Sequence, residues 1–318
     1  MVGREVPVIA EKEGEDRMKM GTIYLRSPAK INLSLLVLGR RADGFHELLT
    51  EMAMIDLFDN IKLERTRQEG IHLSLSGRTI DGDPQKNLVV RALEALMERV
   101  RQGGGSNVGG FAVDLEKNIP VGAGLGGGSS NAAIVLWGGN RLLGSPLGFN
   151  ELDEICRGLG SDVPFFLGGP RALGVGRGEV LRPLSPPLSG DVLLWNPGVP
   201  LPTAAVYKAL DPSSYPVQGV CELTEEDRSI KIGSLLKSGK FFNSLEAPAL
   251  SLCPQIGKGI DFLESFRPGN VRMTGSGPTV FARCISQEEG HDLSRRIVAD
   301  LGGWAGVFKF LEAPPVSF

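Results

Sequence analysis

The sequence predicts an α+β protein built from two domains. Segments with strand character crowd the first 80 residues, and helical and strand-like segments alternate after them, a succession that favours layered α+β domains. The chain has 318 residues, which suits two domains of ordinary size. A proline-rich stretch at 182–190 is the best candidate for a boundary. We therefore expect a solvated tail over residues 1–20, an N-terminal domain over 21–184 and a C-terminal domain over 185–318.

The N-terminal region is predicted from its apolar periodicity. Alternating apolar residues indicate strands at 23–27, 30–39, 48–58, 60–65, 71–76 and 111–115. Helical spacing indicates helices at 87–101, 129–143 and 152–160, the last ending at a glycine. Short segments at 163–167, 172–175 and 179–184 complete this half.

The C-terminal region continues the alternation of strands and helices. Strands are expected at 192–196, 272–274, 279–284 and 304–310, the middle two on either side of a second glycine loop. Helices are expected at 203–210, at 287–301 and, interrupted by a proline, at 249–266.

Charge and composition exclude several classes of protein. Lys and Arg number 34 and Asp and Glu 37, so there is no basic excess to attract a nucleic acid. No run of 18 apolar residues would form a membrane span, and five acidic residues among the first 20 are unlike a targeting peptide. Four scattered cysteines without a CxxC pair suggest reduced thiols. We expect a soluble cytoplasmic protein that binds neither nucleic acid nor membrane.

The most informative segment is the glycine loop from Pro120 to Asn131. Five glycines fall within 122–128, directly before a predicted helix that Ser129 or Ser130 is placed to cap. A helix N-terminus attracts anions, and glycines let phosphates approach the main chain, so the segment predicts a phosphate-binding loop. The plain alternative is a flexible surface loop.

Two other phosphate loops fit this segment less well. It is not a Walker A loop, because no Gly-Lys-Ser/Thr follows. Residues 122–127 match GxGxxG, yet a dinucleotide site needs its glycines directly after a strand and an acidic residue at the end of the next strand. Asn118 to Pro120 intervene here, and Glu151 and Asp153 fall in a helical stretch, so a dehydrogenase is disfavoured.

Three stretches in order, Ser27–Leu33, Pro120–Asn131 and Thr274–Pro278, resemble the three motifs of the GHMP small-molecule kinases. Two more, Leu38–Leu48 and Leu159–Phe165, are similar to the branch of that family that phosphorylates the 2-hydroxyl of a cytidine-diphosphate-linked methylerythritol in non-mevalonate isoprenoid synthesis. The resemblance implies an N-terminal domain like the second domain of ribosomal protein S5 and a ferredoxin-like C-terminal domain. It implies ATP and Mg²⁺ as cofactors, and we expect a monomer or weak homodimer.

Lys30 and Asp162 are the candidate catalytic residues. Alone, Lys30 would be a solvated lysine and Asp162 a turn residue in the loop after a helix. The resemblance implies that Asp162 takes the proton of the attacking hydroxyl, and that Lys30 keeps Asp162 ionised and stabilises the attacking oxygen. Asn32 shares a strand face with Lys30 and is expected to position the hydroxyl.

The resemblance also assigns the nucleotide site. The loop residues expected to bind ATP are Pro120, Gly122, Gly124, Leu125, Gly126, Gly127, Gly128, Ser129 and Ser130. Asn87 matches an adenine contact but equally fits a helix N-cap, and Lys117 either approaches the nucleotide or is a solvated strand-end lysine. The magnesium ligands stay unassigned, with Ser130 either a ligand or a cap. A valine at Gly126 is expected to displace the phosphates while the fold stays intact.

The substrate site is expected to read cytosine. The resemblance implies that His46 reads the base edge between the aromatic rings of Phe45 and Tyr207, with Thr203 close by, although Tyr207 also fits a core aromatic on a helix face. Phe45 stands where the family usually has Tyr, and Ser244 where it usually has Asp, at a site expected to be structural.

Two other functions stay open for this scaffold. One is another GHMP kinase, such as homoserine kinase, from which the segment at 39–47 separates the chain. The other is a catalytically inactive nucleotide-binding regulator, against which the presence of both Lys30 and Asp162 argues.

Overall fold

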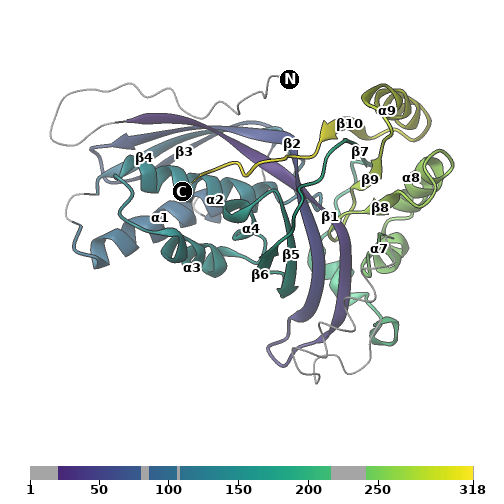
Figure 1. The fold of residues 1–318 in the computed structure, drawn as a ribbon, viewed down its shortest axis with the longest axis horizontal. Helices are drawn as coiled ribbons and strands as arrows, with labels where there is room; N and C mark the ends of the chain where they lie inside the picture. The colour runs from purple at the N-terminus through teal and green to yellow at the C-terminus, as the bar shows by residue number, and fades with distance from the viewer. Residues whose placement is uncertain (1–20, 80–85, 106–107, 216–240, 318) are drawn as a thin grey trace.

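The computed structural model describes residues 21–79, 86–105, 108–215 and 241–317. The tail expected at 1–20 and Cys221 lie outside the described residues. Two β-sheets lie next to each other along the long axis of the molecule, and helices cover one face of each (Figure 1). The described part of the chain contains no helix long and apolar enough to cross a membrane.

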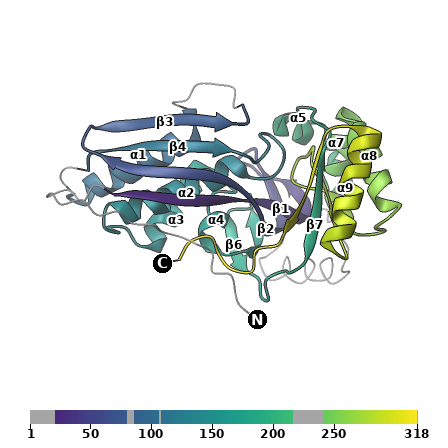
Figure 2. The ribbon, with the colours of Figure 1, turned by 90° about the horizontal axis from the view of Figure 1, so that it is seen from above.

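The first sheet is built around two long strands. Its order is β3-β4-β2-β5-β6, with β1 paired to β2, and only β3 and β4 run parallel. The strands are β1 (Thr22–Arg40), β2 (His46–Thr66), β3 (Gly70–Gly77), β4 (Gly110–Lys117), β5 (Arg171–Gly176) and β6 (Val180–Pro183). The view from above shows β1 to β4 lying alongside one another (Figure 2).

The division of β1 and of β2 into two strands each, expected from the sequence, is wrong. Pro28 and Asp59 interrupt the apolar pattern, which makes each strand look like two. The pairing register shifts between Pro28 and Ala29, and again at two later points, so bulges absorb the irregular residues and the strands continue.

Four helices cover one face of the first sheet: α1 (Leu88–Gln102), α2 (Gly127–Leu142), α3 (Phe149–Leu159) and α4 (Phe165–Gly168). Helix α2 lies in the centre, and its glycines allow close packing on both sides. A Cβ at Gly138 would lie 2.6 Å from Leu25 Cδ1, and one at Gly139 would lie 2.8 Å from Leu96 Cδ2. Helix α2 is therefore held in a fixed position by the sheet and by α1.

The second sheet has the antiparallel order β10-β7-β9-β8. Its strands are β7 (Asp191–Asn196), β8 (Val271–Met273), β9 (Val280–Arg283) and β10 (Trp304–Lys309). The helices are α5 (Thr203–Lys208), the 3-10 helix η2 (Pro212–Ser214), α7 (Glu246–Leu252), α8 (Gln255–Glu264) and α9 (Gln287–Leu301). The bounds of α9 are those expected from its spacing, and the proline-interrupted stretch is the pair α7 and α8.

The two halves share their packing through β1 and the C-terminal segment. Leu25 packs in the first half and Leu35 among side chains of the second half, while Ile31 lies in a cluster that both halves form. After β10 the chain returns to the first sheet, where Leu311 N donates to Met54 O at 3.0 Å and Val316 is buried (Figures 1 and 2). A boundary at residue 184 therefore stays a prediction, because β1 belongs to both cores.

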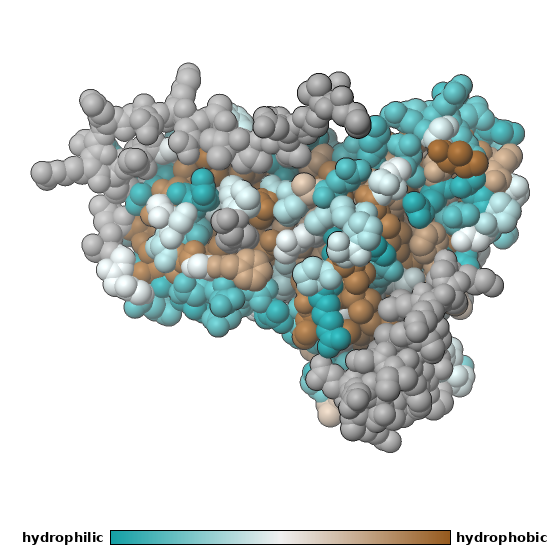
Figure 3. Space-filling model, viewed as in Figure 1, coloured by the Kyte–Doolittle hydropathy of each residue, from teal (hydrophilic) through white to brown (hydrophobic). Residues whose placement is uncertain are grey.

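The hydrophilic and hydrophobic parts of the surface follow the arrangement of the elements. In the view of Figure 3, hydrophilic residues follow the edge at α3, and hydrophobic ones gather near the middle of the face, over the lower parts of β1 and β2. Among the described cysteines, Cys156 and Cys253 are buried and Cys284 is partly buried, and all three are free thiols. This is the state that the sequence predicts for them.

Candidate active site

A cleft of about 880 Å³ lies between the two halves. Of the residues predicted for the site, all except Ser130 line this cleft: Lys30, Asn32, Phe45, His46, Asn87, Lys117, Pro120, Gly122, Gly124, Leu125, Gly126, Gly127, Gly128, Ser129, Asp162, Thr203 and Tyr207. The structure thus brings together segments that are up to 177 residues apart, counted as 207 − 30.

The glycine loop has a backbone that only glycine adopts easily. Gly122, Gly124 and Gly126 have φ values of +63°, +75° and +68°. A Cβ at Gly124 would lie 2.3 Å from Thr274 O, so the two glycine loops pack backbone against backbone. The loop ends at the start of α2, whose free N–H groups favour an anion.

The expected capping of α2 by Ser129 or Ser130 is wrong. Gly126 is the N-cap residue, and no side chain caps the helix. Ser130 is fully buried instead, where Ser27 Oγ donates to its hydroxyl at 2.7 Å. A valine at Gly126 would strain the loop, contrary to the expectation of an intact fold, because the residue has a φ of +68° and a Cβ there would lie 3.0 Å from side-chain atoms of Lys30 and Phe166. The expected displacement of the phosphates stays a prediction.

Lys30 and Asp162 form an ion pair at the centre of the cleft. Lys30 Nζ lies 3.3 Å from Asp162 Oδ2, and the lysine side chain is 4% exposed against 38% for the aspartate. The bland interpretation of Lys30 as a solvated lysine is therefore wrong. Lys30 thus supplies a buried positive charge beside the Asp162 carboxylate, which is the more exposed group of the pair.

Asn32 holds this pair in place. Its Oδ1 accepts a hydrogen bond from Lys30 Nζ, and its Nδ2 donates to Thr50 Oγ1 at 2.7 Å. Its backbone N–H donates to Thr274 Oγ1 at 2.8 Å, which ties β1 to the second glycine loop. The Lys30–Asp162 pair is thus supported by a connected set of hydrogen bonds.

An aromatic wall lines another part of the cleft. The rings of His46 and Tyr207 lie 5.0 Å apart at 31°, and Arg177 stacks 4.9 Å above the ring of Phe45, which is 52% exposed. Burial, helped by the charge of Arg40, lowers the pKa of His46 below 6.5, so the imidazole is neutral at pH 7. A neutral imidazole offers one donor and one acceptor to a base.

Other residues predicted to contact the substrate or the nucleotide also have partners within the protein. Burial raises the pKa of Tyr207, which also packs on the core of the second half, as the bland interpretation holds. Thr203 Oγ1 lies 2.7 Å from Ser276 Oγ, in the second glycine loop. Asn87 is the N-cap of α1 and accepts from Val89 N at 3.0 Å, and it lines the cleft at the same time.

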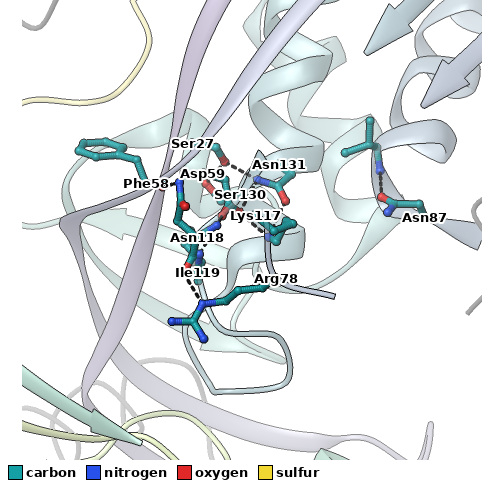
Figure 4. A network of polar contacts seen from close by, with 11 residues as sticks. Ser27, Phe58, Asp59, Arg78, Asn87, Lys117, Asn118, Ile119, Ser130 and Asn131 are labelled. Carbon is teal, nitrogen blue, oxygen red and sulfur yellow. Dashed lines mark hydrogen bonds and ion pairs between the residues drawn. The ribbon is translucent and has the colours of Figure 1, made fainter. Parts of the chain in front are cut away.

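A buried polar cluster beneath the glycine loop was not predicted. Asp59 is fully buried and bound to Lys117, which is only 3% exposed, so the solvated alternative for Lys117 is wrong (Figure 4). Asn131 and Ser27 complete the cluster. The available signals were an aspartate inside an apolar strand and an asparagine inside an apolar helix.

Ser244 accepts from Val37 N at 3.1 Å, which is the structural role expected of it.

Comparisons with known proteins match both halves of the chain. A family model described as the GHMP kinases N terminal domain matches residues 87–169, and one described as GHMP kinases C terminal matches residues 225–301. A Desulfotalea psychrophila protein named 4-diphosphocytidyl-2-C-methyl-D-erythritol kinase is 41% identical over 283 residues, which cover 87% of this chain and 91% of that protein. A Bacillus subtilis protein of the same name is 39% identical over 263 residues, covering 81% and 87%.

Solved structures show the same fold. The crystal structure of a 4-(cytidine 5'-diphospho)-2C-methyl-D-erythritol kinase matches with a TM-score of 0.70 and 32% identity, covering 90% of this chain and 98% of that one. A homoserine kinase from Cytophaga hutchinsonii matches with a TM-score of 0.68 at 18% identity, covering 92% and 95%, which shows the fold alone. The chain therefore belongs to the GHMP kinases, a family of ATP-dependent small-molecule kinases with this two-domain fold.

Proposed function

We propose that the protein transfers the γ-phosphoryl group of ATP to the 2-hydroxyl of 4-diphosphocytidyl-2-C-methyl-D-erythritol, a step of the non-mevalonate isoprenoid pathway. One observation carries the proposal: the Lys30–Asp162 pair lies in one cleft with both the glycine loop and the wall of His46 and Tyr207. The names of the relatives at about 40% identity support the same substrate.

The transfer follows from the positions of these groups. ATP binds with its phosphates against the glycine loop and the N-terminus of α2. The substrate places its base at the aromatic wall and its alcohol beside Asp162, which accepts the hydroxyl proton as the oxygen attacks the γ-phosphorus and the bond to the β-phosphate oxygen breaks. Lys30 offsets the charge on the attacking oxygen and on Asp162.

The cleft fits a magnesium ion that arrives with ATP. The described residues contain no group of three or more His, Cys, Asp or Glu that would cage a metal, and Asp162 is the only acidic side chain among those lining the cleft. Mg²⁺ at such sites takes most of its oxygens from phosphates and water. When bound, it would neutralise phosphate charge during the transfer. Ser130 does not line the cleft and its hydroxyl accepts from Ser27 Oγ, so we do not assign it to the metal.

The active form we expect is a monomer or weak homodimer. We place the activity in the cytoplasm, because the reaction consumes ATP. Sedimentation at assay concentration checks the first point.

A panel of substrates tests the proposal. We expect the cytidine substrate to be phosphorylated with a kcat/KM far above that of its uridine analogue, because a site that hydrogen-bonds one base rejects another by up to about 10⁴-fold. Homoserine should not react. Equal rates with cytidine and uridine substrates would remove the base-reading role, rapid turnover of homoserine would select another GHMP activity, and ATP binding without any turnover would favour a regulator.

A further inference from the structure

Asp59 supplies the carboxylate of the polar cluster beneath the glycine loop, and both of its oxygens accept two hydrogen bonds. Its Oδ1 accepts from the backbone N–H groups of Asn118 and Ile119 at 2.7 and 2.8 Å. Its Oδ2 accepts from Asn131 Nδ2 at 2.9 Å and from Lys117 Nζ. The side chains of Asp59, Lys117 and Asn131 come from β2, β4 and α2 and meet between them (Figure 4).

These contacts fix both ends of the glycine loop. Asn118 and Ile119 directly precede Pro120, where the loop begins, and Asn131 lies in the second turn of the helix that follows it. One buried carboxylate therefore joins the entry and the exit of the segment that faces ATP.

The Lys117 ammonium lies at the start of α2. A Cβ at Gly127, the first residue of α2, would be 3.2 Å from Lys117 Nζ, and both residues line the cleft. Within residues 21–79, 86–105, 108–215 and 241–317, this ammonium has two acceptors, Asp59 and Asn131 Oδ1 at 2.9 Å. One of its three N–H groups is left for a ligand in the cleft.

We propose that Asp59 is a positioning residue for ATP, whose carboxylate holds the Lys117 ammonium so that its third N–H points toward the bound nucleotide. The inference rests on the placement of ATP at the glycine loop given above. Asp59 itself is fully buried and does not line the cleft, so it acts on the nucleotide only through Lys117.

The charge of Asp59 matters because Lys117 is buried. Burial lowers the pKa of Lys117, and Asp59 opposes this. Asp59 on β2 supplies the carboxylate in contact with it, whereas α2 contributes the neutral amide of Asn131 and β1 the neutral hydroxyl of Ser27 to the same cluster. Arg78 donates to Asn118 O on the exposed side, and the backbone N–H of Lys30 donates to Leu125 O in the loop at 3.0 Å. An asparagine at this position would therefore leave a buried cation without its counter-charge.

The variant Asp59→Asn tests this, with the affinity for Mg²⁺ and a non-hydrolysable ATP analogue measured from pH 6 to 9. Lys117 is a cation at pH values below its pKa and a neutral amine above it. Removing the charge of Asp59 removes an interaction that raises this pKa, so the variant should lose the cation, and with it affinity for the analogue, as the pH rises. We expect the variant-to-wild-type ratio of dissociation constants to rise to about tenfold at pH 9 and to be much smaller at pH 6. A ratio that is the same at every pH would mean a merely structural role and would overturn the proposal.

Asp114→Asn is the matched control. It removes the same charge from an exposed aspartate on the adjacent strand β4, where Lys62 lies 3.5 Å away at the surface. We expect its ratio to stay near one throughout. A pH-dependent loss equal to that of Asp59→Asn would show a general effect of sheet charge and contradict the proposal.

Lys117→Gln keeps the proposal testable if Asp59→Asn fails to fold. In the double variant that carries both substitutions, both changed side chains are amides, so the cluster stays polar and holds no unpaired charge. We expect Lys117→Gln to weaken analogue binding about tenfold. Adding Asp59→Asn to it should change binding less than about twofold, since coupled residues are not additive. Wild-type affinity in Lys117→Gln, or a large further loss in the double variant, would overturn the proposal. Binding is measured without the alcohol, so an error in the proposed substrate would leave these ratios unaffected.

Discussion

At the scale of single residues, the site depends on charges that the protein keeps out of water. Lys30 is buried beside a half-exposed Asp162 and donates to Asn32, whose own amide donates to Thr50. Both side chains line the cleft, and the aspartate is the more exposed of the two. We propose that this arrangement separates two roles, with Asp162 placed to touch the hydroxyl and Lys30 placed to offset the negative charge beside it.

Asp162→Asn tests the role of the base. Asparagine keeps the shape but cannot accept the proton, so we expect kcat to fall by about 10²–10⁴-fold, with little change in the KM of either substrate. Lys30→Ala should be similarly slow, and the double variant should be far from additively worse, because the two residues act on one hydroxyl. Near-normal turnover by Asp162→Asn would show that the proton leaves by another route.

His46 gives the site a predictable pH dependence. Its pKa lies below 6.5, so the neutral ring is present above that pKa and is lost as pH falls through it. We expect the KM for the cytidine substrate to be flat near pH 7 and to rise in acid. His46→Ala should have a high KM that lacks this rise. Retention of the same acid limb in the variant would assign it to another group.

At the scale of elements, the glycine loop is a rigid turn rather than a flexible link. Three of its glycines have positive φ, and its backbone contacts Thr274 in the second loop. Gly128 differs from them, because its Cβ would meet only Leu88, 3.8 Å away, and both residues line the cleft. It is the position at which a side chain can enter the cleft without disturbing the turn.

Gly128→Val should therefore weaken ATP binding while leaving the melting temperature close to wild type. The valine has an ordinary helical backbone and its side chain would take up space in the cleft next to the loop. We therefore expect at least about a tenfold loss of affinity, which corresponds to about 1.4 kcal/mol. Gly158→Val, at an exposed and open position of α3, is the control. An unchanged affinity in folded Gly128→Val would remove this loop from the nucleotide site.

The elements that depend on local pattern were predictable from the sequence, and those that depend on pairing were not. Helix α9 begins after Ser286, which caps it, and its bounds follow from its spacing. The bulges that keep β1 and β2 continuous arise only when the two strands pair. Resemblance to family motifs named Lys30 and Asp162, but Asp59 and Lys117 meet across two strands, 58 residues apart, with no local signal of the contact.

At the scale of the whole molecule, the cleft exists because the two halves share a core. Phe310 is 5% exposed and lies in the cluster that joins β1 to β7 and β9, just before the C-terminal segment returns to the first half. Phe310→Ala should lower the free energy of unfolding by about 3–5 kcal/mol, the usual cost of such a cavity. Urea denaturation measures this.

Phe266→Ala is the comparison for this prediction, because Phe266 is 39% exposed on the outer side of the second half. We expect a loss of about 1 kcal/mol or less there. Equal losses in the two variants would mean that Phe310 does not join the halves.

The central claim is that this cleft moves a phosphoryl group from ATP to the alcohol of a cytidine-diphosphate-linked substrate. The most direct measurement is phosphorus NMR of the product formed by wild-type protein and by Asp162→Asn from ATP and 4-diphosphocytidyl-2-C-methyl-D-erythritol. The account predicts ADP and a new phosphate monoester on the 2-hydroxyl with wild type, and almost none in the same time with the variant. A phosphate on another hydroxyl, hydrolysis of ATP without transfer, or equal product from both proteins would contradict it.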